Sequence, residues 1–65
     1  MNVREIIRLL TADGWAEVRS KGGHRQFRHA TKRGTVTVPV HGARDVSPMV
    51  IRSIERQSGV TLRKG

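Results

Sequence analysis

Hydrophobic residues recur along the chain with two periods, one helical and one strand-like. Residues 2–12 carry the first helical pattern, with Asn2 as a suitable N-cap and Glu5 three residues later, as in a capping box. Gly14 is suited to the left-handed position that ends a helix. The predicted buried face has the i, i+3, i+4, i+7 spacing and consists of Val3, Ile6, Ile7 and Leu10.

A second helical pattern follows Ser47-Pro48, a typical N-cap and first helical residue. Gly59 ends this helix, and we expect the basic end of the tail at residues 60–65 to be loosely held. The apolar stripe of the helix consists of Val50, Ile51 and Ile54.

The first predicted strand covers residues 15–19 and leads into a turn at 20–23. Trp15 could serve as a platform for stacking a base, but a small domain needs its few large apolar side chains inside, which favours the core. Simple alternation places the remaining side chains on two faces, Ala16 and Val18 on one and Glu17 and Arg19 on the other.

The second predicted strand covers residues 24–29, and Phe27, its one strongly apolar residue, should face the helices. Arg25 and His29 share its parity and should reach the rim. The opposite, open face then carries His24, Gln26 and Arg28.

The third predicted strand covers residues 35–40 and alternates valine with threonine and proline. A hairpin loop at 30–34 precedes it and a loop at 41–46 follows it. The resulting order is α-β-β-β-α within a single domain, residues 1–65. We expect an α+β fold of two layers, in which both helices cover one face of a three-stranded antiparallel sheet.

The net charge of the chain and its distribution limit the classes of partner that the domain would bind. Thirteen Lys and Arg against five Asp and Glu give a net charge of +8, and residues 18–44 contain no acid. This clustering favours a nucleic-acid partner, with an acidic protein partner as the alternative. A membrane-surface helix fits less well, because the basic residues fall in predicted strands and turns. No apolar run is long enough to span a membrane and cysteine is absent, so we expect a cytoplasmic protein without thiolate metal sites.

His24 is the candidate catalytic residue, since histidine exchanges protons near neutral pH. RNA cleavage without a metal needs a base, an acid and positive groups that stabilise the charged intermediate. The alternative is that His24 only contacts phosphate. The candidate RNA-binding residues are Lys21, Gly22, Gly23, Arg25, Gln26, Arg28, Lys32 and Arg33.

No metal or cofactor site is expected. His29 and His41 do not form a standard zinc spacing with His24, and the five acids are too scattered for a two-metal nuclease site. We assign His29 to the rim and His41 to a loop that could touch RNA.

Five segments carry a resemblance to a known family: residues 5–10, Gly14-Trp15, residues 21–29, residues 34–39 and residues 51–59. Together they run over almost the whole length. In these segments the chain resembles the HicA family, the mRNA interferase toxins of HicA–HicB toxin–antitoxin systems.

The resemblance implies a fold like that of double-stranded-RNA-binding domains and a metal-independent endoribonuclease that cleaves mRNA and arrests growth. It implies that His24 is the key catalytic residue and that a HicB-type antitoxin binds the toxin. Many family members have Ser or Thr immediately before this histidine, whereas this chain has Gly23. A non-catalytic RNA-binding module of the same fold is the alternative.

Overall fold

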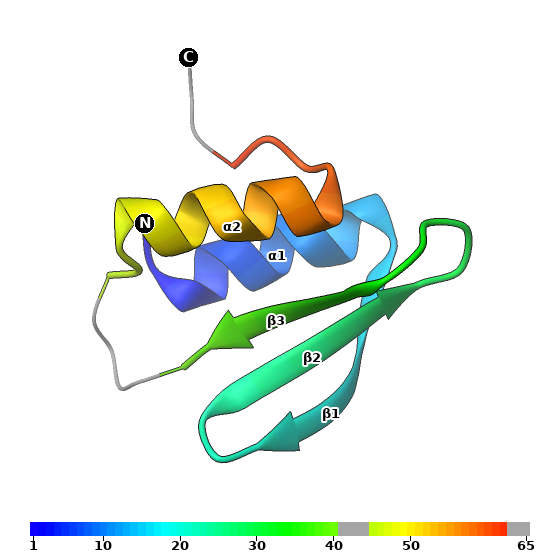
Figure 1. Ribbon diagram of the computed structural model, residues 1–65, viewed down its shortest axis with the longest axis horizontal. Helices are drawn as coiled ribbons and strands as arrows, with labels where there is room; N and C mark the ends of the chain where they lie inside the picture. Colours follow the sequence, from blue (N-terminus) through cyan, green and yellow to red (C-terminus); the bar gives the residue numbers. More distant parts are fainter. Residues whose placement is uncertain (41–44, 63–65) are drawn as a thin grey trace.

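The computed structural model describes residues 1–40 and 45–62. Its elements are α1 (Val3–Asp13), β1 (Trp15–Lys21), β2 (His24–His29), β3 (Thr35–Pro39) and α2 (Pro48–Ser58). The antiparallel sheet has the order β1-β2-β3, so β2 is central, and the helices pack on one side of it (Figure 1). The predicted α+β fold is confirmed. Residues 41–44 of the predicted loop and 63–65 of the predicted tail lie outside the described residues.

Local capping interactions determine where both helices begin and end. The Asn2 side chain accepts a hydrogen bond from the Glu5 N–H at 2.8 Å, and the Ser47 hydroxyl accepts one from Val50. Gly14 and Gly59 end the helices as predicted, and both have positive φ. Neither described helix has the length and apolar character needed to cross a membrane.

The core lies between the helices and one face of the sheet. Trp15 is 1% exposed and therefore belongs to the core rather than to a base-stacking surface. Beyond Trp15, every residue of β1 is exposed, so the far end of the β1–β2 hairpin has little cover from the helices. The other core side chains are Ile6, Leu10, Phe27, Val36, Val38, Val46, Ile51, Ile54 and Leu62.

Two core residues come from segments that the sequence pattern assigned to a loop and a tail. Val46 is 9% exposed, and its N–H donates to the Met1 carbonyl at 2.9 Å. Leu62 is 3% exposed, and its N–H donates to the Glu55 carboxylate at 2.8 Å. These contacts fasten the chain on both sides of α2.

The first strand is longer than predicted and is interrupted by a β-bulge. β1 continues to Lys21, which shortens the predicted turn to two residues. Glu17 pairs with Phe27 and Arg19 pairs with Gln26, so the register shifts between them. Glu17 therefore lies on the helix side and Arg19 on the open side, and the prediction that they share a face was wrong. β3 ends at Pro39, one residue before the predicted end.

Candidate nucleic-acid interface

A tight turn positions the proposed catalytic histidine. Lys21 pairs with His24, and the two residues between them, Gly22 and Gly23, have φ values of 57° and 81°. Two consecutive positive φ angles in a two-residue hairpin loop are characteristic of a type I′ turn, for which Gly-Gly is well suited. The Gly23 carbonyl accepts a hydrogen bond from Val40 at 2.6 Å, which ties the turn to the end of β3.

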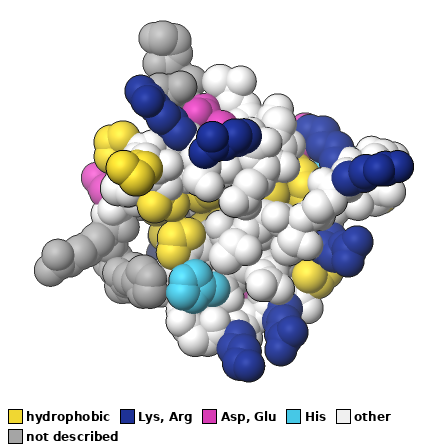
Figure 2. All heavy atoms as spheres, viewed as in Figure 1, with side chains coloured by type: hydrophobic (Ala, Val, Ile, Leu, Met, Phe, Trp, Pro, Cys, Tyr) yellow, Lys and Arg dark blue, Asp and Glu magenta, His cyan; other side chains and the backbone are white. Residues whose placement is uncertain are grey.

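The open face of the sheet is cationic. His24 is exposed, and Figure 2 shows a histidine side chain close to Lys and Arg side chains at the end of the sheet where the turn lies. The described face contains no Asp or Glu in its cross-strand rows. Side chains directly opposite each other on neighbouring strands have Cβ atoms about 4.5–5.5 Å apart. The rows are Lys21–His24–Pro39, Arg19–Gln26–Thr37 and Ala16–Arg28–Thr35.

Arg25 lies on the other side of β2, at the rim, as its parity predicts. Its guanidinium donates two hydrogen bonds to the Glu17 carboxylate, of which that from Nε to Oε2 spans 3.0 Å. This bidentate pair raises the pKa of Arg25, and the hydrogen bond from Arg25 lowers the pKa of Glu17 below its usual value. Arg25 is thus partly neutralised, whereas no ion pair between described residues involves the cations of the open face.

His29 has a structural environment that its predicted rim position did not suggest. Its Nδ1 accepts from the backbone N–H groups of Thr31 and Lys32 at 3.0 and 3.1 Å. Nε2 must then carry the ring proton, and it donates to the Asp13 carbonyl at 2.7 Å. The ring also packs edge-on against Trp15, with centroids 5.2 Å apart. We call this cluster of Asp13, Gly14, Trp15, His29 and Lys32 the packed corner.

Lys32 and Arg33 lie far from His24. They follow the end of β2, and six strand residues place the two ends of β2 roughly 17 Å apart. Figure 1 shows the β2–β3 loop and the β1–β2 turn at opposite ends of the sheet. Lys32 donates to Asp13 at 2.7 Å and to the Ser58 carbonyl at 3.1 Å. The hydrogen bond from Lys32 to the Asp13 carboxylate is the main cause that lowers the pKa of Asp13.

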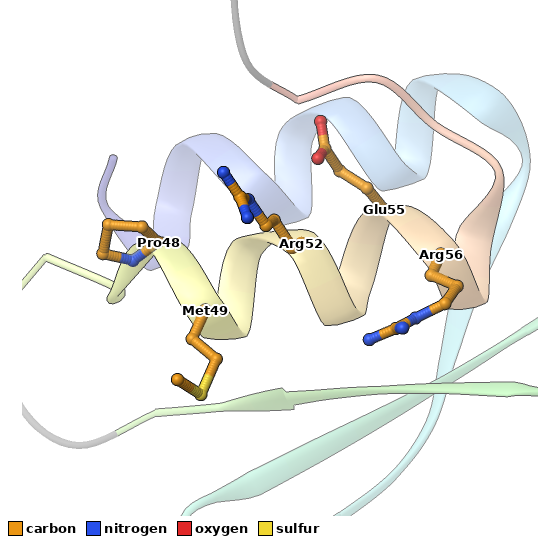
Figure 3. Close-up of a pocket in the computed structure, with 5 residues that line it drawn as sticks. All are labelled: Pro48, Met49, Arg52, Glu55 and Arg56. Atoms are coloured by element: carbon orange, nitrogen blue, oxygen red, sulfur yellow. The ribbon is translucent and has the colours of Figure 1, made fainter.

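A surface hollow of about 660 Å³ lies away from these residues, on the outer side of α2 (Figure 3). All of its described lining residues belong to one helix, so among them it does not bring groups from different elements together. Within the described ranges, no three His, Cys, Asp or Glu side chains are grouped as a metal site would require. The lining residues are Pro48, Met49, Arg52, Glu55 and Arg56.

Sequence reasoning missed Arg19 as a member of the open face. The available signal was electrostatic, because an unbroken register would place Arg19 directly opposite Arg25, and facing like charges destabilise a sheet. The bulge places Ser20 opposite Arg25 instead.

Comparison with known proteins identifies the family. The sequence matches the family described as the HicA toxin of bacterial toxin–antitoxin systems over residues 3–60. This range includes both helices, the whole sheet and the turn before His24. A search of curated proteins gives no match. The family match covers most of the chain, which therefore belongs to the HicA family, the toxins of bacterial toxin–antitoxin systems.

Proposed function

We propose that this toxin is a metal-independent endoribonuclease that cleaves mRNA in the cytoplasm and uses His24 for proton transfer. The observation that carries the proposal is the position of His24 on an exposed sheet face whose charged side chains, among the described residues, are cationic. Such a face attracts the phosphate backbone of RNA, and histidine can serve as general base or general acid near neutral pH.

The reaction follows from these groups. His24 takes the proton of a ribose 2′-hydroxyl, and the 2′-oxygen forms a bond to the adjacent phosphorus. The bond from phosphorus to the 5′-oxygen then breaks, and an acid protonates that oxygen. The products are a 2′,3′-cyclic phosphate and a 5′-hydroxyl. Lys21, directly opposite His24, is the nearest candidate for stabilising the charge on the phosphorane, with Arg28 farther along β2.

The donor set near His24 supports a reaction without a metal. Mg²⁺ in nucleases is held mainly by carboxylates, and the cross-strand rows around His24 supply lysine, arginine, glutamine and threonine instead. The cations can provide the charge stabilisation that a metal would otherwise give.

We further propose that a HicB-type antitoxin neutralises the toxin by covering the open face. Membership of the HicA family supports an antitoxin partner, and the charge of the face suits an acidic surface. The antitoxin and RNA would then compete for one surface. Adding the cognate antitoxin should displace labelled RNA, whereas a ternary complex would contradict this arrangement.

The test is cleavage of a single-stranded mRNA in EDTA by the parent chain and by His24→Ala and His24→Gln. We expect the parent to cut and both variants to lose activity by about 10²–10⁴-fold, the usual contribution of one general acid or base. All three should bind RNA with similar affinity, because lysine and arginine supply most of the attraction to the phosphate backbone. The 3′ ends of the fragments should carry a cyclic phosphate.

Two results would contradict the nuclease proposal. Cleavage that persists in His24→Ala would place the active site elsewhere. RNA binding by a parent that does not cut would instead support the alternative function, a non-catalytic RNA-binding module. Induced expression in a bacterial host adds a second readout, since the parent should arrest growth and His24→Ala should not.

A further inference from the structure

We infer that Arg19 is an RNA-binding residue, placed on the His24 face by the β-bulge in β1 and holding the phosphate next to the one that is cleaved. The inference rests on the proposed function of that face. It adds a contact that strict strand alternation would assign to the opposite side.

The pairing of β1 with β2 places Arg19 on the open face. Without a bulge, Glu17 opposite Phe27 would be followed by Val18 opposite Gln26 and Arg19 opposite Arg25. The observed pairing is Arg19 with Gln26, one residue later. Residues that pair directly point to the same face, so Arg19 shares the open face with Gln26 and, two residues along β2, with His24.

The environment of Arg19 leaves its charge available. The side chain is exposed, and among the described residues no carboxylate lies within ion-pair distance of it. Arg25 differs, because Glu17 holds its guanidinium on the helix side. The bulge therefore places the two arginines on opposite faces, with Arg25 paired to Glu17 and Arg19 facing solvent.

The spacing assigns Arg19 a role in binding rather than in the chemical step. Lys21 is opposite His24, and Arg19 is two residues farther along β1, or about 6.6 Å at the rise of a strand. A chain whose scissile phosphate lies beside His24 and Lys21 therefore brings a neighbouring phosphate to Arg19. Arginine can hold that phosphate with two parallel N–H donors.

The experiment measures binding and cleavage separately. Binding uses a fluorescent single-stranded oligoribonucleotide whose 2′-oxygens are methylated, so that the parent protein cannot cut it. The variants are Arg19→Ala and Arg19→Lys. The matched control is Arg4→Ala, which removes one exposed cation from α1 in the helix layer. Circular dichroism checks that each variant is folded.

We expect Arg19→Ala to weaken binding about fivefold or more at low salt and to reduce the salt slope by about 0.7, the value for one phosphate contact on a single strand. Arg4→Ala should change affinity less than about twofold, because Arg4 lies in the helix layer and salt screens its charge from RNA on the sheet. On a cleavable RNA, Arg19→Ala should raise KM and leave kcat near the parent value. Arg19→Lys should restore much of the affinity.

The outcomes separate this inference from the proposed function. If the parent binds and cuts RNA but Arg19→Ala behaves like Arg4→Ala, the role of Arg19 is refuted and the nuclease proposal stands. A loss confined to kcat would also refute it, because it would place Arg19 in the chemical step. If the parent binds no RNA even at low salt, both proposals fail.

A single uncharged methylphosphonate beside the cleavage position should weaken parent binding but have little further effect on Arg19→Ala.

Discussion

The two histidines at the ends of β2 show how differently this small domain uses the same side chain. At the packed corner, His29 accepts from two backbone N–H groups, donates to the Asp13 carbonyl and packs against Trp15. Its side chain is only 11% exposed. At the other end, His24 follows a two-glycine turn and lies on an exposed cationic face. Structural hydrogen bonds occupy both ring nitrogens of His29, which suits it to stabilising the fold.

The glycines beside the two histidines differ in the same way. A Cβ on Gly14 would lie 2.7 Å from His29 Nε2, so this glycine permits the close approach of α1 to the end of β2. A Cβ on Gly22 would meet nothing within 4 Å. Both have positive φ, but only the packed corner adds a steric requirement to the conformational one. The end of the sheet at the packed corner is thus closely packed, whereas the end at the two-glycine turn is open to a ligand.

The largest predicted effect is that of Gly14→Ala. The φ of +107° and the contact with His29 together should cost about 3 kcal/mol, against about 1 kcal/mol for Gly22→Ala, where only backbone strain applies. A single core in a domain of this size supplies about 3–5 kcal/mol, so Gly14→Ala should keep at most about 2 kcal/mol and be partly unfolded near physiological temperature. Thermal denaturation followed by circular dichroism compares the two, and equal melting temperatures would contradict the steric role of His29.

His29→Ala should follow, lowering the free energy of unfolding by about 2 kcal/mol, because two backbone N–H groups lose their acceptor. His24→Ala is the matched control and should stay within about 0.5 kcal/mol of the parent, since His24 is exposed. Urea denaturation measures both. If His24→Ala were the more destabilising variant, the division between a structural and an accessible histidine would be wrong.

Local signals in the sequence predicted most of the fold. Asn2, Ser47, Gly14 and Gly59 mark the helix ends through contacts within a few residues, and the predicted bounds of β2 are those observed. Contacts between residues that are distant in the sequence were harder to predict. The burial of Leu62 depends on Glu55 and on the far side of the core, which no local periodicity reports.

The candidate site was predictable in part. Alternation along β2 places His24, Gln26 and Arg28 on one face, as observed. Alternation along β1 fails at the bulge, because one unpaired residue reverses the parity of everything after it. The attachment of Lys32 to Asp13 and Ser58 joins segments that are distant in sequence, so a basic loop tip gave no sign of it.

The two faces of β2 yield a third prediction. Arg28→Ala should weaken RNA binding about fivefold, because Arg28 belongs to the open face, whereas Arg25→Ala should weaken it less than about twofold. Both variants remove one charge, so fluorescence anisotropy at several salt concentrations separates position from net charge. A larger loss in Arg25→Ala would show that RNA also reaches the helix-side rim.

The smallest expected effect is a change in the stability of the fold at acidic pH. Lys32 and Arg25 lower the pKa values of Asp13 and Glu17 in the folded protein, so the unfolded chain binds more protons as the pH falls through their usual values near 4. The stability these pairs contribute is fully present above about pH 5 and is lost below it as the folded carboxylates are protonated.

Asp13→Asn and Glu17→Gln should each flatten the fall of the urea midpoint between about pH 5 and pH 3. At neutral pH, Asp13→Asn should have the larger effect, because Asp13 and Lys32 join the end of α1 to the β2–β3 loop and, through Ser58, to α2. Glu17 joins only two neighbouring strands at the exposed hairpin. The larger loss in Glu17→Gln would mean that the hairpin end contributes to stability as much as the packed corner does.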